Sequence, residues 1–311
     1  MTFPTPAAKV TEPQSGAAAR LAAPLRWLVA VVQSTRPRQW PKNLLVFAAP
    51  LAGDSFGRPY GFWYALIACG AFVAASSAVY LINDVVDAER DRGHPYKKFR
   101  PIASGRLPAA HAVVLAVALV VVAIGTGLVI GEPLLTLAVA AYLAISFLYS
   151  AWLKHVPVVE LACVASGFVL RVVGGAAATH VPPSGYFLLV CSLGALMVAI
   201  AKRYTELTVL GADASTHRPA MRGYTAPVLR LTQRIVSTVM IVSYVLWASS
   251  EPHPRTRSWH LVSSIALACA LLRFDRLTAR ATSKPVEDLI ARDPVMVVCE
   301  AAWLILFAVG L

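Results

Sequence analysis

Long apolar stretches follow one another along almost the whole chain, separated by short polar, glycine-containing or proline-containing breaks. Most of them approach about 20 residues, the length of α-helix that crosses the hydrocarbon core of a bilayer. The pattern therefore predicts an all-α integral membrane protein with about nine transmembrane helices. We expect these helices near residues 36–53, 62–82, 109–130, 133–150, 157–178, 185–201, 229–249, 259–274 and 293–311.

The beginning of the chain does not follow this pattern. Residues 1–25 are rich in Ala, Pro, Ser and Thr, and their apolar pieces are too short and interrupted for a signal peptide. We interpret residues 1–25 as a disordered cytoplasmic tail. Residues 26–311 then form a single transmembrane domain, because the apolar stretches leave no room for a sizeable soluble domain.

Composition supports a membrane protein and adds a charge imbalance. Hydrophobic residues make up 58% of the chain and charged residues 14%, and the formal net charge is +12. Such a charge suits membrane lipids with anionic headgroups, or an anionic substrate. The five cysteines stand singly in apolar segments, so we interpret them as small hydrophobic residues rather than as a metal site or a disulfide framework. We expect no nucleic-acid partner, and homo-oligomer formation is left open.

The basic residues are distributed unequally between the two sets of connections. Connections from an odd-numbered to an even-numbered predicted helix carry Arg58, Arg255 and Arg257, whereas most other Lys and Arg residues lie in the tail and in the even-to-odd connections. The positive-inside bias then predicts a cytoplasmic N-terminus, and the odd number of helices leaves the C-terminus outside. We expect a multi-pass protein of the plasma membrane.

An acidic motif follows the second predicted helix, in the sequence LINDVVDAERDRGHPYKKFRPIASG at residues 81–105. If the helix continues past Tyr80, then Asp84, Asp87 and Asp91 lie on one face, and Asn83 borders that face. Like charges at helical spacing destabilise a helix, but oxygen ligands on one face suit a hard divalent cation such as Mg²⁺. We therefore predict that Asn83, Asp84, Asp87 and Asp91 bind Mg²⁺.

Cations follow the acids directly, once Gly93 and Pro95 end the helix. Lys97, Lys98 and Arg100 lie within reach of an anion that is bridged to the acids by a metal. The sequence thus indicates a site for a Mg²⁺ diphosphate. The alternative interpretation is a solvated helix end, whose acids pair with neighbouring cations.

Ionisable residues within predicted helices are candidates for function, because charge at membrane depth is costly. Glu160 and Arg171 lie three turns apart in the fifth predicted helix, too far for an ion pair, and Lys154 precedes them at the cytoplasmic side. For Arg171 the alternative is a structural contact between helices, and we interpret Glu300 as structural.

The sixth predicted helix ends in the sequence AKRYTEL, which contains Lys202, Arg203, Tyr204 and Glu206. Two interpretations of this segment are open: an anchor at the membrane interface, or a binding site for a phosphate or ribose.

Together these segments resemble the UbiA superfamily of intramembrane transferases. Its NDxxDxxxD motif appears here at residues 83–91, and the similarity extends from RPRQWPKNLLVFAAPLAG to AKRYTEL. The resemblance implies nine helices around a central cavity that opens to the cytoplasmic side and laterally to lipid. Most members carry a second motif, DxxxD, after the sixth helix, and this chain has KRYTEL there instead. The departure favours substrates that are more anionic than an isoprenoid diphosphate.

Within the superfamily, the segments HPYKKFRPIASG, SAWLKHVPVVELACVASGFVLR and AKRYTEL are most similar to an actinobacterial branch of phosphoribosyltransferases. This resemblance implies phosphoribosyl diphosphate (PRPP) as donor, a polyprenyl (decaprenyl) phosphate as acceptor and Mg²⁺ as cofactor. The product would be a precursor of cell-wall arabinan, such as arabinogalactan. We expect Asp84, Asp87 and Glu160 to be catalytic. The expected substrate-binding residues are Lys42, Asn43, Lys97, Lys98, Arg100, Lys154, Arg171, Lys202, Arg203 and Tyr204.

Two other functions compete with this interpretation. A polyprenyl diphosphate:aromatic prenyltransferase of quinone synthesis is disfavoured by the missing DxxxD motif. A cation-coupled transporter is disfavoured because the acids cluster at one face of the membrane and no inverted repeat of broken helices is evident.

Overall fold

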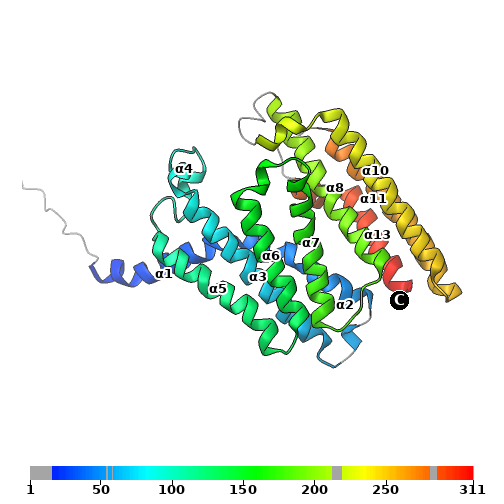
Figure 1. The fold of residues 1–311 in the computed structure, drawn as a ribbon, viewed down its shortest axis with the longest axis horizontal. Helices are drawn as coiled ribbons and strands as arrows, with labels where there is room; N and C mark the ends of the chain where they lie inside the picture. Colours follow the sequence, from blue (N-terminus) through cyan, green and yellow to red (C-terminus); the bar gives the residue numbers. More distant parts are fainter. Residues whose placement is uncertain (1–15, 54, 58, 212–218, 281–285, 311) are drawn as a thin grey trace, which may run out of the picture.

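The computed structural model describes residues 16–53, 55–57, 59–211, 219–280 and 286–310. In these ranges every regular element is a helix (Figure 1). The predicted all-α class is confirmed.

Six helices are long and apolar enough to cross a membrane. They coincide with six of the predicted transmembrane segments within four residues at each end, except that the helix beginning at Gly185 continues nine residues beyond its predicted end at 201. The chain is therefore a multi-pass membrane protein. The six are α3 (Gly61–Val86), α5 (Ala109–Val129), α6 (Pro133–Ala151), α7 (Val159–Ala178), α8 (Gly185–Leu210) and α10 (Ala226–Ser250).

The last two predicted segments are also helical, but neither is both long enough and apolar enough to count as a membrane-spanning candidate. Helix α11 (Pro254–Ala279) has 26 residues and carries several charges at both ends. Helix α13 (Pro294–Gly310) is apolar but has 17 residues. Among the described residues six membrane-spanning candidates are found, so the predicted number of nine is not confirmed.

The first predicted segment, 36–53, is wrong as a continuous α-helix. The chain forms an 11-residue 3₁₀-helix, η1 (Pro37–Phe47), followed by the short α2 (Ala48–Ala52). Pro41 lies inside η1 and lacks the backbone N–H that an α-helix would bond to the carbonyl of residue 37, whereas proline is tolerated at the first position, which Pro37 occupies.

Helix α1 (Gly16–Ser34) precedes η1. It already includes the end of the tail predicted at 1–25, whose first 15 residues lie outside the described ranges. The remaining elements are short and connect the long helices: η2 (Ser55–Gly57), α4 (Ala88–Arg92), η3 (Lys97–Phe99), η4 (Leu153–His155), η6 (Pro219–Gly223) and α12 (Val286–Arg292).

The long helices pack as two neighbouring groups. Helices α3, α5, α6 and α7 contact one another, as do α8, α10, α11 and α13, and the α7–α8 contact joins the groups. The 3₁₀-helix η1 packs against α3 and α7. A Cβ atom at Gly175 would overlap the Val46 carbonyl oxygen, so glycine is needed where α7 crosses η1.

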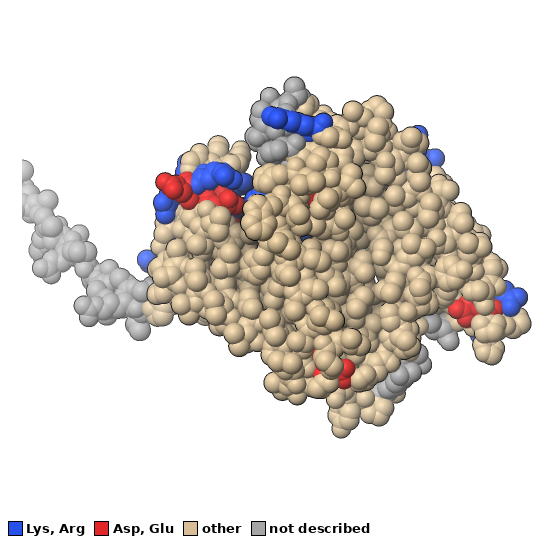
Figure 2. Space-filling view, in the orientation of Figure 1, with Lys and Arg blue, Asp and Glu red and all other residues tan. Residues whose placement is uncertain are grey.

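Consecutive long helices run in alternating directions, which brings their polar ends together (Figure 1). The end of α3, the start of α7 and the end of α8 lie at the same end of the bundle. Figure 2 shows acidic and basic side chains gathered there over α4, while the middle of the visible face carries few charges. The candidate site is therefore sought at this end.

Candidate active site

The acidic motif does not lie on one continuous helix, which corrects the sequence-based expectation. Helix α3 ends at Val86, Asp87 has φ −87° and ψ 0°, and α4 begins at Ala88. Two backbone hydrogen bonds keep the chain turning in the same direction. Asp87 N–H donates to the Asn83 carbonyl at 2.9 Å and Asp91 N–H donates to the Asp87 carbonyl at 2.8 Å. Asp84 and Asp91 consequently still face the same side.

Asp84 and Asp91 are both buried, and one guanidinium joins them. Arg100 Nη1 lies 3.1 Å from Asp84 Oδ1 and 2.6 Å from Asp91 Oδ2. Arg36 Nη2 also donates to Asp84 Oδ1, at 2.5 Å, and its guanidinium stacks on the Tyr80 ring. Arginine therefore balances the buried charge of both carboxylates, as buried charge requires.

The other residues of the motif lie at the rim of this group. Lys97 Nζ is 4.0 Å from Asp91 Oδ1. Asp87 is turned toward Arg90 at 3.5 Å, and Lys98 lies over the Phe99 ring. All three acids therefore pair with cations, but Asp84 and Asp91 are buried, whereas Asp87 is half-buried at the rim.

A polar cavity of about 510 Å³ opens beside this group. Its lining brings Arg36, Arg38 and Arg100 together with Asp84 and Gln33, which is the mixture that an anion bridged to a metal requires. Arg36 was not among the site residues predicted from the sequence. Its contact with Asp84 joins residues 48 positions apart, and the one local signal is its place at the polar start of an apolar run.

A second group lies between the start of α7 and the end of α8. Glu160 is fully buried, and its Oε1 is 2.8 Å from Arg203 Nε. Arg203 Nη1 donates in addition to Glu206 Oε2 at 2.5 Å. The structure thus joins two segments that the sequence analysis considered separately, and Arg203 is held between two carboxylates.

Tyr224, just after η6, completes this group and was not predicted. Its hydroxyl oxygen accepts from Val158 N–H at 2.7 Å, and the same side chain hydrogen-bonds to Glu160. Burial, more than any other cause, raises the pKa of the Tyr224 phenol, so it stays a neutral donor to the Glu160 carboxylate. Val158 has φ 67°, a strained value for a β-branched residue, and Tyr224 holds this turn in place.

Arg171 belongs to a third group deeper in the bundle. Its Nε donates to Asn43 Oδ1 at 2.7 Å and its Nη2 to the Tyr142 hydroxyl at 3.2 Å. Asn43 is fully buried in η1. These bonds connect η1, α6 and α7, which supports the structural alternative for Arg171.

The remaining predicted residues lie in different surroundings. Tyr204 packs under the guanidinium of Arg230 at 5.4 Å, so it is turned toward α10. Lys154 is half-buried in η4, and Lys42 and Lys202 are half-buried in η1 and α8. Asn83 is half-buried beside Asp84.

The acidic group has the chemistry to hold Mg²⁺. Within the described ranges, no three His, Cys, Asp or Glu side chains come together as a metal-binding group. Mg²⁺ does not need such a cage, because it is usually held by one or two carboxylates together with waters and substrate phosphates. Asp84 and Asp91, which share one guanidinium, supply such a pair of carboxylates.

The fold first defines the class of protein. The structure is similar to that of a UbiA homolog from Archaeoglobus fulgidus bound to GPP and Mg²⁺, with a TM-score of 0.68. The similarity covers 90% of this chain and 98% of that chain at 16% sequence identity. This likeness shows a shared fold of membrane helices.

The sequence then identifies the family. Residues 44–289 match the model of the UbiA prenyltransferase family, and the chain belongs to that family. It is 38% identical over 285 residues to decaprenyl-phosphate phosphoribosyltransferase of Mycobacterium tuberculosis, covering 90% of this chain and 94% of the relative. It is 34% identical over 278 residues to the enzyme of the same name from Corynebacterium glutamicum, covering 88% of this chain and 84% of the relative.

Proposed function

We propose that this protein transfers the 5-phosphoribosyl group from PRPP to a polyprenyl phosphate, with decaprenyl phosphate as the acceptor and Mg²⁺ as cofactor. The observation that carries the proposal is the 38% identity, over 90% of the chain, to an enzyme named for this reaction. The product would be a polyprenyl-phosphoryl-phosphoribose that supplies cell-wall arabinan.

The cation-rich site supports a donor with several phosphates. Asn83, Asp84, Asp87 and Asp91 would hold the metal. Bound Mg²⁺ supplies neutralisation of the diphosphate charge. The guanidinium groups of Arg36 and Arg100 line the same cavity as Asp84, and guanidinium pairs well with phosphate oxygens.

The reaction needs no strong general base. The bond from ribose C1 to the diphosphate oxygen breaks with its electron pair on the leaving diphosphate, and an anionic oxygen of the acceptor phosphate forms the new bond to C1. Positive charge grows on the sugar ring as in glycoside chemistry. The protein's contribution is to position both phosphates and neutralise their charge.

The group of Glu160, Arg203 and Tyr224 would bind the phosphate that the group around Asp84 does not hold. Glu160 has no exposed surface and is paired with Arg203 and Tyr224, so we assign it to positioning Arg203 rather than to contact with the sugar. Lys154 and Lys202 flank this group in sequence.

Radioactive donors distinguish this function from that of other family members. Membranes containing the protein are incubated with decaprenyl phosphate and PRPP labelled in the ribose, or with a labelled isoprenoid diphosphate and an aromatic acceptor. We expect the ribose label in the lipid fraction, its loss with EDTA, and its return with added Mg²⁺. Label entering the aromatic product instead would make the protein an aromatic prenyltransferase, and turnover in detergent would exclude a pure transport role.

A further inference from the structure

Arg38 differs from the other two arginines of the polar cavity beside Asp84. Three guanidinium groups line this cavity of about 510 Å³, those of Arg36, Arg38 and Arg100. Arg36 and Arg100 both contact Asp84, and Arg100 also contacts Asp91. The side chain of Arg38 is exposed and, within the described ranges, forms no ion pair or hydrogen bond. Its positive charge therefore comes in addition to the two that balance the acids.

The side-chain amides of the same cavity present further hydrogen-bond donors. Gln33 uses its carbonyl oxygen, Oε1, to accept from Arg106 Nη1 at 2.9 Å. Its amide NH₂ group is then left for a ligand, because neither of its N–H groups is hydrogen-bonded in the part of the chain that the structure describes. Gln39 lines the cavity as well. Amide and guanidinium donors in one cavity favour an anion that accepts several hydrogen bonds.

The turn that carries Arg36 and Arg38 is strained and fixed in place. Arg36 has φ 54° and ψ 66°, a left-handed conformation that residues with a side chain rarely adopt. Pro37 restricts the backbone next to it, and Gln39 N–H donates to the Arg36 carbonyl at 2.8 Å. The Arg36 guanidinium also stacks on the Tyr80 ring, 4.7 Å from its centre. Backbone strain that the surroundings maintain is characteristic of ligand sites, so this turn presents its arginines before any ligand binds.

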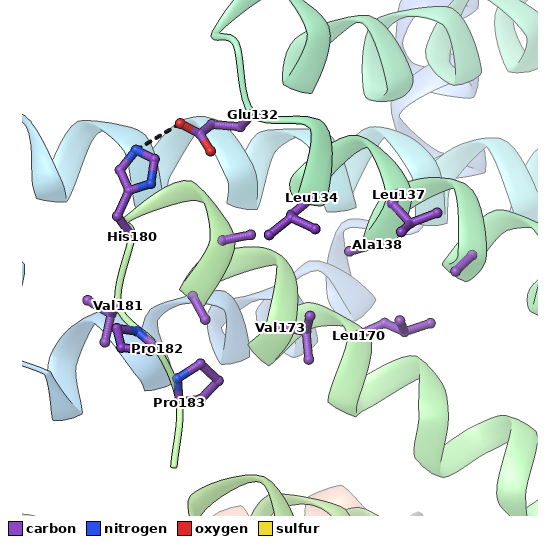
Figure 3. A pocket seen from close by; sticks show the side chains of 13 residues that line it. Glu132, Leu134, Leu137, Ala138, Leu170, Val173, His180, Val181, Pro182 and Pro183 are labelled. Carbon is purple, nitrogen blue, oxygen red and sulfur yellow. Dashed lines mark ion pairs between the residues drawn. The ribbon is translucent and has the colours of Figure 1, made fainter. Parts of the chain in front are cut away.

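The cavity suits a water-soluble anion better than the phosphate of a lipid. It shares no lining residue with three apolar cavities that lie between the long helices. The apolar cavity in Figure 3, between α6 and α7, has its charged groups at one end, where His180 Nε2 lies 2.8 Å from Glu132 Oε1. That pair follows the end of α7, whereas the Asp84 group lies at the level of the start of α7 (Figure 1). A phosphate beside Arg38 therefore does not lie at the mouth of any of these three cavities.

We propose that Arg38 binds the 5-phosphate of PRPP and thereby sets the specificity for this donor, while Asp84 with its metal, Arg36 and Arg100 hold the diphosphate. This inference rests on the proposed function. PRPP carries a diphosphate at C1 and a monophosphate at C5 of one ribose, so a site that selects it needs cations for both. An isoprenoid diphosphate has only the first group and gains nothing from Arg38. The cavity volume of about 510 Å³ is typical of small-molecule sites.

Two donors that differ by one phosphate test the proposal. Ribose 1-diphosphate keeps the C1 diphosphate of PRPP and lacks the 5-phosphate. We expect Arg38→Ala to lower kcat/KM for PRPP about tenfold or more and to leave kcat/KM for ribose 1-diphosphate unchanged, because the lost contact exists only with PRPP. Arg38→Lys should restore part of the PRPP value, since it returns the charge without the paired donors. The matched control Arg26→Ala removes an exposed arginine of α1 that does not line the cavity, and it should change neither value.

Equal losses with both donors would overturn the proposal, because Arg38 would then support the fold or the diphosphate rather than the 5-phosphate. A raised KM for decaprenyl phosphate with an unchanged KM for PRPP would assign Arg38 to the acceptor instead. In both cases the proposed reaction stands. Should the unmodified protein transfer no phosphoribosyl group, the proposed function fails, and binding of ribose 5-phosphate in detergent decides the site alone. Weaker binding by Arg38→Ala than by Arg26→Ala supports the site, and equal binding contradicts it.

Discussion

The two buried acids of the motif are held by arginines, whereas Asp87 is half-buried and faces Arg90. A cation that binds Asp84 must therefore compete with Arg36 and Arg100 for the same carboxylate. A substrate phosphate resolves this competition, because it offers both guanidinium groups another anion. At the scale of single residues, metal and donor are thus expected to bind together.

The first prediction concerns the carboxylates. Asp84→Asn and Asp87→Asn each remove a negative oxygen from the proposed metal site while keeping the shape of the side chain. We expect phosphoribosyl transfer to fall by about 100-fold or more in either variant, with the protein still inserted and eluting as a single peak in detergent. Initial rates with saturating substrates measure the loss.

Asp293→Asn is the matched control for these two variants. Asp293 is also ion-paired, with Arg273 at 2.6 Å, but it lies between α12 and α13. Its variant should keep most of the activity. Full activity of Asp84→Asn would show that this carboxylate holds no essential metal.

A second prediction concerns Arg36. Its guanidinium contacts Asp84 and lines the polar cavity, so Arg36→Ala should raise the KM for PRPP about tenfold or more, with a smaller effect on the KM for the acceptor. Arg36→Lys should restore part of the affinity, because it returns the charge but not the paired donors. An unchanged KM for PRPP in Arg36→Ala would assign this residue to structure alone.

At the scale of elements, hydrophobic pattern predicted the long helices well, because each of the six spans carries its apolar run without an interior proline. It failed at 36–53, where the run is apolar but Pro41 interrupts α-helical hydrogen bonding and residues 37–47 form a 3₁₀-helix. It also missed the break at Asp87. No proline or glycine marks that break, and the buried contacts of Asp84 and Asp91 that accompany it come from residues distant in sequence.

The contact between η1 and α7 leads to a third prediction. Gly175→Ala places a methyl group where the Val46 carbonyl lies, so the two elements must separate. We expect the free energy of unfolding to fall by about 3 kcal/mol or more, which is the upper end of the cost of overpacking a core. The cost is high because backbone, rather than a flexible side chain, must move. Thermal unfolding in detergent provides the measurement.

Gly185→Ala serves as the comparison for Gly175→Ala. Gly185 is the first residue of α8, and a Cβ atom there meets nothing within 4 Å. The unfolding temperature of the Gly185→Ala variant should stay close to that of the unmodified protein. Equal behaviour of the two variants would mean that η1 does not pack on α7 as described.

At the scale of the whole molecule, alternating helix directions gather at one end of the bundle the groups that the sequence presents far apart (Figure 1). The sequence alone indicated most members of these groups, since acids and cations in apolar surroundings are conspicuous. It could not indicate that Glu160 pairs with Arg203, or that Arg36 and Tyr224 take part, because these contacts join separate helices and connections. The sequence therefore indicates candidate site residues, whereas the packing of the helices determines which of these residues contact one another.

The orientation of the bundle in the membrane gives the last prediction. The excess of Lys and Arg in the even-to-odd connections predicts that the Asp84 group faces the cytoplasm, where PRPP would be its substrate. His94 lies beside this group, so His94→Cys should react with a membrane-impermeant maleimide only in inside-out vesicles. Arg255 lies at the start of α11, at the opposite end of the bundle, so Arg255→Cys should react only in right-side-out vesicles. Both positions are exposed, so access of the reagent depends on the side of the membrane. The reverse labelling would place the site outside and remove PRPP as a plausible donor.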